Sequence, residues 1–228
     1  MKKLNKTLKL VFLFLFIITA SYYTYTNTDI SDFTSFENAI SDNQYYETVN
    51  NNKVNFTDSE IKRMSKHGYE YYSKLDSLGR CSVCYACVGI ETMPTEERGE
   101  IGMIKPTGWH TIKFDNVDGK YLYNRCHLIG YQLTSENANK RNLITGTRQL
   151  NVEGMLPFEN EVAEYIKNTN NHVMYRVEPV FEDNNLLAKG VNMQAKSIED
   201  DKLEFNVFCY NTQKGIKINY INGDAQTE

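Results

Sequence analysis

The sequence predicts a mixed α+β domain built on an antiparallel sheet. Three segments in the last third of the chain alternate apolar and polar residues in the manner of strands, and Asp- and Asn-containing turns separate them. A helical pattern beginning at Pro157 precedes them. The chain has 228 residues, 41% of them hydrophobic, which is enough to bury a core. Strands in a run with few helices are typical of an α+β fold.

The domain is expected to open with a short helix followed by a strand. Thr57 and Glu60 have the spacing of a capping box, and a helical pattern continues into residues 61–76. Residues 80–90 (RCSVCYACVGI) are rich in the residue types that favour strands. A loop punctuated by Gly and Pro is expected over residues 93–108.

A hairpin and a longer helix are expected next. Residues 109–114 and 121–128 are predicted to pair through the turn Asp118–Gly119. Pro157 suits the first turn of a helix over residues 157–169, whose apolar positions recur on one face. The three alternating segments that follow are residues 172–182, 186–198 and 202–211.

The first 25 residues have the features of an export signal. Four lysines precede an apolar run from about Leu10 to Ala20, which is shorter than the ~20 residues that a spanning helix needs. Residues 1–25 are therefore expected to be a signal peptide or a membrane anchor. A flexible linker is expected over residues 26–54 and the compact domain over residues 55–224. We expect the protein to be secreted or tethered to the outer face of the cytoplasmic membrane.

Five cysteines leave three interpretations open. Three of them lie in CSVCYAC, whose CxxC spacing suggests zinc, but a four-ligand site would need a further ligand from elsewhere in the chain. One disulfide or buried free thiols would also fit the sequence.

The charge of the chain is uneven. The net charge of −4 argues against a polyphosphate partner if it is taken as an average. Residues 120–151, however, hold five basic residues and one acidic residue, a local charge of +4. The basic residues are Lys120, Arg125, Lys140, Arg141 and Arg148. This stretch is a predicted contact for a phosphate backbone.

Residues 123–160 contain the groups that phosphodiester hydrolysis requires. The reaction needs a base to activate water, a divalent cation to neutralise charge on the phosphate, and donors to hold the phosphate. His127 is followed at a distance by Asn142, Asn151 and Glu159. Imidazole, amide and carboxylate groups can supply the base and the ligands of a hydrated cation.

The motifs in this stretch resemble those of the DNA/RNA non-specific endonucleases of the ββα-metal (His-Me finger) superfamily, especially the DNA-entry and secreted nucleases of Gram-positive bacteria. Asn124-Arg125-Cys126-His127 stands in place of the family's DRGH motif, and Leu128-Ile129-Gly130-Tyr131 follows as in the family. The similarity covers roughly residues 55–224. It implies a ββα-metal finger on the antiparallel sheet.

The resemblance also implies a function and a set of site residues. The implied function is sequence-nonspecific, metal-dependent cleavage of DNA, with RNA as a second substrate. His127 would be the general base, and Asn151 would hold one Mg²⁺, with Mn²⁺ as an alternative. Asn142 would help to arrange the site, and Glu159 would hold waters of the cation. Arg98 matches the family's transition-state arginine loosely.

Further basic residues are expected to clamp the nucleic-acid backbone through its phosphates. They are Arg80, Arg125, Lys140, Arg141 and Arg148. Of these, Arg125 is expected on the face of its strand opposite His127, as a structural or phosphate-approach residue. Such contacts carry no sequence information.

Two departures from the family motif bear on activity. Asn124 removes a negative charge beside the base, and Cys126 adds a side chain to a tight strand. Two other functions compete with the nuclease interpretation. One is an exported DNA-binding or uptake module without turnover, and the other is a small zinc-binding domain built on CSVCYAC.

Overall fold

The computed structural model describes residues 44–228. The expected signal peptide or anchor and residues 26–43 of the expected linker lie outside the described residues. Within residues 44–228, no helix combines the length and the apolar character that crossing a membrane requires.

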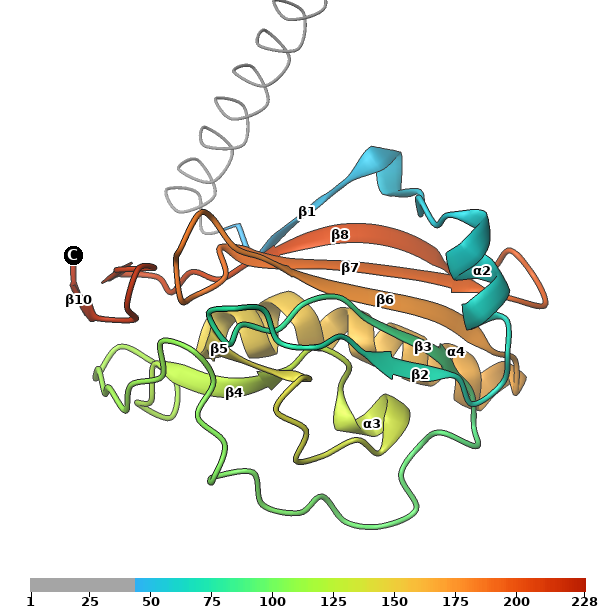
Figure 1. Ribbon diagram of the computed structural model, residues 1–228, viewed down its shortest axis with the longest axis horizontal. Coiled ribbons are helices and arrows are strands. Elements are labelled where there is room, and N and C mark those ends of the chain that lie inside the picture. Colours follow the sequence, from blue (N-terminus) through green and yellow to red (C-terminus); the bar gives the residue numbers. More distant parts are fainter. Residues whose placement is uncertain (1–43) are drawn as a thin grey trace, which may run out of the picture. The chain divides into compact units, whose positions relative to one another are not determined.

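The main element is a six-stranded antiparallel sheet with the strand order β1-β8-β7-β6-β3-β2 (Figure 1). Its strands are β1 (Tyr46–Thr48), β2 (Glu70–Tyr72), β3 (Cys84–Val88), β6 (Val173–Val180), β7 (Gly190–Ser197) and β8 (Glu204–Tyr210). Two smaller antiparallel pairs are β4 (Tyr123–His127) with β5 (Leu143–Thr147), and β9 (Ile216–Ile218) with β10 (Ala225–Thr227). The helical segments are η1 (Asn50–Asn52), α2 (Asp58–Met64), α3 (Tyr131–Thr134), η2 (Leu150–Met155) and α4 (Leu156–Thr169). The predicted α+β class with an antiparallel core is confirmed.

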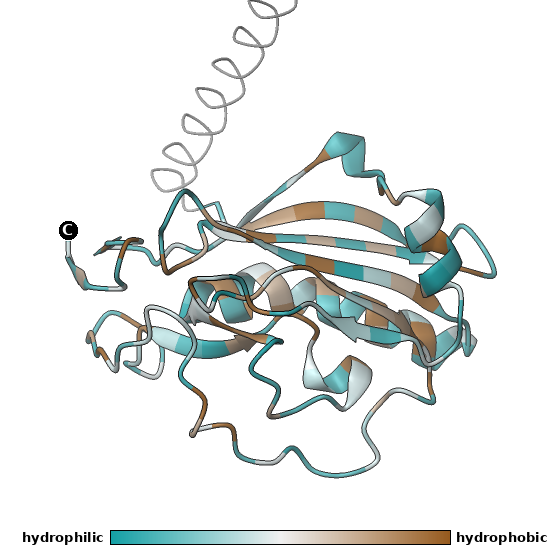
Figure 2. Ribbon diagram, viewed as in Figure 1, coloured by the Kyte–Doolittle hydropathy of each residue, from teal (hydrophilic) through white to brown (hydrophobic). Residues whose placement is uncertain are grey.

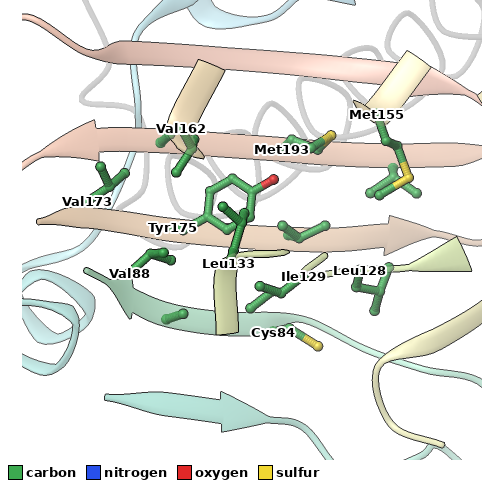
Figure 3. Close-up of a cluster of buried hydrophobic side chains, with 14 of the residues drawn as sticks. Cys84, Val88, Leu128, Ile129, Leu133, Met155, Val162, Val173, Tyr175 and Met193 are labelled. Carbon is green, nitrogen blue, oxygen red and sulfur yellow. The ribbon is translucent and has the colours of Figure 1, made fainter. Parts of the chain in front are cut away.

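One face of the sheet forms the hydrophobic core. Along β6 the buried side chains Val173, Tyr175 and Val177 alternate with residues of the opposite face, and Figure 2 shows the same alternation along β7 and β8. α4 lies against this face with Val162 fully buried (Figure 3). Ile166 of the same helix is also fully buried. Burying one such side chain stabilises the fold by roughly 1.5–3 kcal/mol. The amphipathic pattern of residues 157–169 thus fixes α4, including Pro157 in its first turn, onto the sheet.

The predicted capping box of the first helix is present. The side chain of Thr57 accepts from the backbone N–H of Glu60, and the Glu60 carboxylate accepts from the backbone N–H of Thr57. Arg176 on β6 donates to Glu60 at 3.1 Å. Burial opposes ionisation of Glu60, but these hydrogen bonds outweigh it and lower the pKa of Glu60 to about 2. The helix is shorter than expected: α2 ends at Met64, and residues 70–72 form β2.

The folded part of the chain begins earlier than predicted. Residues 46–54 were expected to belong to the linker, but β1 pairs with β8, with Tyr46 opposite Cys209. This edge strand is largely exposed, so backbone pairing holds it and its side chains give little periodic signal.

The expected hairpin of residues 109–114 with 121–128 forms only next to its turn, where Phe114 N donates to Lys120 O and Leu122 N donates to Ile112 O. One isolated bridge, Lys113 with Tyr121, remains of it. β4 instead pairs with β5, with His127 opposite Leu143, and η2 and α4 follow directly. All residues of β5 are buried, whereas Trp109, Ile112 and Phe114 are half-buried and pack against a second, smaller core cluster. β4, β5 and the following helix form the implied ββα finger.

All five cysteines are buried and free. The thiols of Cys81 and Cys84 donate to backbone carbonyls, Leu143 O among them at 3.2 Å from Cys81 Sγ. Burial raises the pKa of Cys81 to about 12 and that of Cys87 to about 12. In residues 44–228 no cysteine belongs to a group of ligand-type side chains close enough to share a metal. Buried thiols are thus the correct one of the three interpretations.

Candidate active site

A pocket of about 520 Å³ lies where β4, η2 and α4 meet. Six of the ten predicted site residues line it: Arg98, Arg125, His127, Arg148, Asn151 and Glu159. The other four do not: Arg80, Lys140, Arg141 and Asn142. The pocket therefore brings together the predicted base, the predicted metal ligand and the predicted carboxylate from separate elements.

His127 ends β4 with a defined tautomer. Its Nε2 lies 2.8 Å from the carbonyl oxygen of Asn137, which can only accept, so Nε2 carries the proton. Its Nδ1 lies 3.1 Å from a guanidinium nitrogen of Arg98, which can only donate, so Nδ1 carries a lone pair. Burial, assisted by the charge of Arg98, lowers the pKa of His127 to about 4 despite the hydrogen bond to Asn137. A neutral imidazole whose Nδ1 carries a lone pair is the form that a general base requires, and here Arg98 donates to that lone pair.

Asn142 lies behind His127 and holds the backbone that follows it. Its side chain is completely buried and forms two hydrogen bonds with the backbone of Ile129, each 2.9 Å long. Its own carbonyl accepts from Leu128 N at 2.8 Å. These bonds fix the chain immediately after His127. The predicted role in arranging the site agrees with this placement, but Asn142 makes no contact with the pocket.

Asn151 lies in η2, a π-helical turn that interrupts the start of the helix. Insertions of this kind are frequent at functional sites because they re-aim side chains. The Nδ2 of Asn151 donates to Asn124 Oδ1 at 3.3 Å, and Asn124 projects from β4. Among residues 44–228 no donor is directed at Asn151 Oδ1, which therefore remains available in the pocket as a cation ligand.

Glu159 on α4 closes the pocket from the helix side. Burial raises the pKa of Glu159 to about 7, although Gln132 and the charge of Arg98 act in the opposite direction. Its carboxylate packs against Gly130, where a Cβ would lie 2.5 Å from Oε2. The glycine of the Leu128-Ile129-Gly130-Tyr131 motif thus makes room for this carboxylate.

Two arginines join the pocket to the loop of residues 98–108. Arg98 belongs to this loop and contacts the base, as described above. Arg125 donates to the carbonyls of Gly102 and Ile104, and its guanidinium stacks over Trp109 with 4.0 Å to the ring centroid. The expectation that Arg125 points away from His127 is wrong, because strand residues two positions apart share a face. Arg125 thus holds the loop that carries Arg98, whose guanidinium contacts His127.

The family model described as DNA/RNA non-specific endonuclease matches residues 58–199. The chain belongs to the DNA/RNA non-specific endonuclease family. It is therefore an endonuclease, and the predicted family is confirmed.

Solved structures of endonucleases share this fold. NucA from Streptococcus agalactiae, solved with a magnesium ion bound, is 25% identical with a TM-score of 0.67, over 81% of this chain and 89% of that one. The Sda1 nuclease, solved with a bound zinc ion, is 23% identical with a TM-score of 0.67, over 83% and 99% of the two chains. An extracellular endonuclease at 19% identity and a TM-score of 0.56 covers 79% of this chain and 96% of its own length.

The endonuclease accommodates Asn124 in place of the motif's aspartate. The contact that Asn124 makes with Asn151 needs one acceptor oxygen, and an amide supplies it as a carboxylate would. Arg148 also donates to Asn124 Oδ1, at 3.4 Å. The substitution therefore keeps the orientation of Asn151 and removes one negative charge from the pocket.

The endonuclease accommodates Cys126 through a glycine on the neighbouring strand. Cys126 is fully buried on β4, and a Cβ on Gly146 of β5 would overlap with its Sγ and lie 3.1 Å from Leu150 Cδ2. The added thiol thus fills space that Gly146 leaves free.

Gly146→Ala is expected to lower the free energy of unfolding by about 1–3 kcal/mol, because the core around Cys126 is closed and has to shift. Urea denaturation at constant m-value measures the change. The double variant with Cys126→Gly should cost less than the two single changes added together. Strict additivity would contradict direct contact between these positions.

The remaining basic residues differ in their contacts. Arg148 lines the pocket and pairs with Asp118 at 2.9 Å. Lys140 and Arg141 are exposed, beyond the pocket lining. Arg80 is only 16% exposed, and its guanidinium is held by Asp76 and by the carbonyls of residues 183 and 185. The structure thus gives Arg80 a structural role instead of the predicted phosphate contact.

The sequence analysis missed two groups of the site. The backbone carbonyl of Asn137 orients the ring of His127, and no side-chain pattern predicts a backbone acceptor. Gln132 lines the pocket beside Glu159 and bonds to Asn160 at 3.0 Å. In the sequence, Gln132 could have been identified as a site residue because it immediately follows Gly130 and Tyr131 of the motif.

Proposed function

We propose that this endonuclease hydrolyses phosphodiester bonds of DNA, and also of RNA, without sequence choice, with His127 as the general base and Asn151 as the residue that holds one Mg²⁺. The observation that carries the proposal is that the His127 lone pair and the unpartnered Asn151 carbonyl oxygen belong to one pocket. The family's description as non-specific for DNA and RNA supports the substrate class.

His127 is arranged to take a proton from water. Its Nδ1 accepts, and the imidazolium that forms keeps its Nε2–H directed at the Asn137 carbonyl. In the resting pocket Arg98 occupies the Nδ1 lone pair. A phosphate that enters the pocket competes for the guanidinium, because a charge-assisted hydrogen bond to phosphate is stronger than one to a neutral imidazole. Substrate binding thus frees the base and places Arg98 on the phosphate.

The residues present fit a hydrated magnesium ion. Mg²⁺ typically takes one or two protein oxygens and keeps several waters; Asn151 Oδ1 would supply the protein oxygen, and Glu159 would hold waters of the ion. When bound, the ion neutralises charge on the phosphate and on the leaving oxygen. Asn124 accepts from the amide nitrogen of Asn151, which would leave the amide oxygen to hold the ion, and Glu159 would accept from its waters. Mn²⁺ suits the same oxygen ligands.

We also propose that the endonuclease acts outside the cytoplasm, secreted or tethered to the outer face of the membrane. The basic and apolar character of residues 1–25 supports this location.

Mapping of fragment ends tests the proposed reaction. Plasmid DNA incubated with the protein and Mg²⁺ is expected to give ends spread over all four nucleotides, and a single-stranded RNA is expected to be cut as well. EDTA should stop both reactions, and added Mg²⁺ or Mn²⁺ should restore them. Cleavage that resists EDTA, or ends clustered at one sequence, would overturn the proposal. DNA binding without any cleavage would favour the uptake module.

The affinity for Mg²⁺ is expected to depend on pH through Glu159. Its carboxyl is protonated below a pKa of about 7 and must lose that proton to hold the waters of the ion. The apparent affinity should therefore fall about tenfold per pH unit below pH 7. His127, with a pKa of about 4, stays neutral over pH 5–7 and adds nothing to this slope. Calorimetric titration should show the slope in the wild type and its loss in Glu159→Gln.

A further inference from the structure

A second cluster of metal-ligating side chains lies outside the active-site pocket. The ligand atoms of His67, His172 and Glu199 all lie within 4.8 Å of one another. None of these three residues lines the active-site pocket. They come from three elements that meet at one end of the sheet, where α2 lies (Figure 1).

The fold fixes this convergence. His172 immediately precedes β6, Glu199 closely follows β7, and the two strands pair there with Val173 opposite Ser197. The backbone N–H of Ile198 donates to the carbonyl of His172 at 2.9 Å. His67 follows the end of α2, and its ring stacks on His172 with the centroids 3.5 Å apart and an interplanar angle of 18°.

Two carboxylates orient the central histidine. Glu199 accepts from the backbone N–H of His172 at 2.8 Å, and another of its oxygens lies 2.6 Å from His172 Nδ1. On the other side of the ring, Glu91 Oε1 lies 3.4 Å from Nε2. A ligating histidine typically uses one ring nitrogen for the metal and the other for a carboxylate, which sets its tautomer. The ring of His172 has the partners for both.

A glycine makes room for this arrangement. A Cβ on Gly89 would lie 2.5 Å from Cδ2 of His172 and would overlap with the carboxylate of Glu91. The His172 side chain is 14% exposed, whereas Glu199 and His67 face solvent. The cluster thus has a half-buried, oriented candidate ligand at its base and exposed candidate ligands through which an ion can enter.

We propose that His67, His172 and Glu199 form a second metal site, selective for Zn²⁺ and similar transition-metal ions, with Glu91 as the carboxylate that orients His172. Two imidazoles and one carboxylate are a ligand set that Zn²⁺ accepts, and water can complete its coordination. Mg²⁺ prefers oxygen ligands and is excluded by the two imidazoles. An ion bound here would tie α2 to β6 and β7.

Zinc titration of the full chain tests the site in a background that lacks the proposed general base and the proposed metal ligand of the active site, His127→Ala with Asn151→Ala. Calorimetry should find one Zn²⁺ per chain that excess Mg²⁺ does not displace, with a rise in Tm. His67→Asn and Glu199→Gln should each weaken binding at least tenfold, and Glu91→Gln by about 10–100-fold. His67 is exposed, so His67→Asn leaves the fold intact and keeps the test valid if a His172 variant is unstable.

His110→Ala is the matched control, because His110 is an exposed histidine outside the cluster. It should bind Zn²⁺ as the background protein does. Failure of the background protein to bind Zn²⁺, or binding that His67→Asn and Glu199→Gln leave unchanged, would overturn the proposal. DNA cleavage by His67→Asn with Mg²⁺ should equal that of the wild type, so failure here is distinguishable from failure of the proposed nuclease reaction.

Discussion

His127→Ala is expected to reduce kcat for DNA cleavage by about 10²–10⁴-fold, the usual contribution of a positioned general base. The variant removes the Nδ1 lone pair that faces Arg98 and the Nε2–H that anchors the ring to Asn137. Initial rates on plasmid DNA at saturating Mg²⁺ measure the loss. KM should change little, because the phosphate contacts of the arginines remain.

Two measurements separate loss of the base from loss of structure. Because His127 is buried, the Tm of the variant is compared with that of the wild type, and rates are taken well below both. His110→Ala, an exposed histidine paired with the carbonyl of Asn222, should keep the wild-type rate. A His127→Ala protein that is folded and cuts DNA at the wild-type rate would refute the assignment of the base.

Asn151→Ala is expected to lower the affinity for Mg²⁺ by at least ~10–100-fold. That is the loss that removal of an outer-shell partner of a metal ligand typically causes. The alanine removes the amide oxygen of Asn151, whose amide group Asn124 holds in place. The concentration of Mg²⁺ at half-maximal cleavage should rise, with part of the activity recovered at high Mg²⁺. Asn124→Ala should give the smaller effect, because it leaves the ligand and removes only its partner.

Asn124→Asp and Asn116→Ala complete this series. The aspartate keeps the acceptor oxygen and adds a negative charge near the ion, so it should bind Mg²⁺ more tightly than the wild type. Asn116 is exposed and bonds to the carbonyl of Lys214, so its replacement should change nothing. Equal dependence of the cleavage rate on Mg²⁺ concentration in the Asn151→Ala and Asn116→Ala proteins would contradict the assignment of Asn151 as a metal ligand.

The sequence predicted those parts of the fold whose signals are local. The capping box at Thr57, the helix from Pro157 and the three alternating strands depend on spacing within one segment, and all are present. The pairing of β4 with β5 was missed because the choice between two partner strands depends on which apolar faces are buried together in three dimensions. β1 was missed because its backbone, and not its side chains, joins it to the sheet.

The same distinction holds within the site. His127, Asn151 and Glu159 were identifiable because they lie at motif spacings in one stretch of chain, and the structure brings them to one pocket. Arg80 was assigned by its charge alone, and charge does not reveal that Asp76 and backbone carbonyls already occupy it. The link from Arg125 through the loop to Arg98 crosses three separate segments, so no local pattern encodes it.

The free state of all five cysteines bears on how the domain reaches its native form. With no covalent cross-link to close, folding calls for neither an oxidase nor an isomerase, and mispaired intermediates do not compete with it. The free energy of unfolding of the domain should be the same in the presence of dithiothreitol as in air-equilibrated buffer. The native conformation is thus available in a reducing interior and in an oxidising medium alike, and without bound metal its stability derives from non-covalent packing and hydrogen bonding.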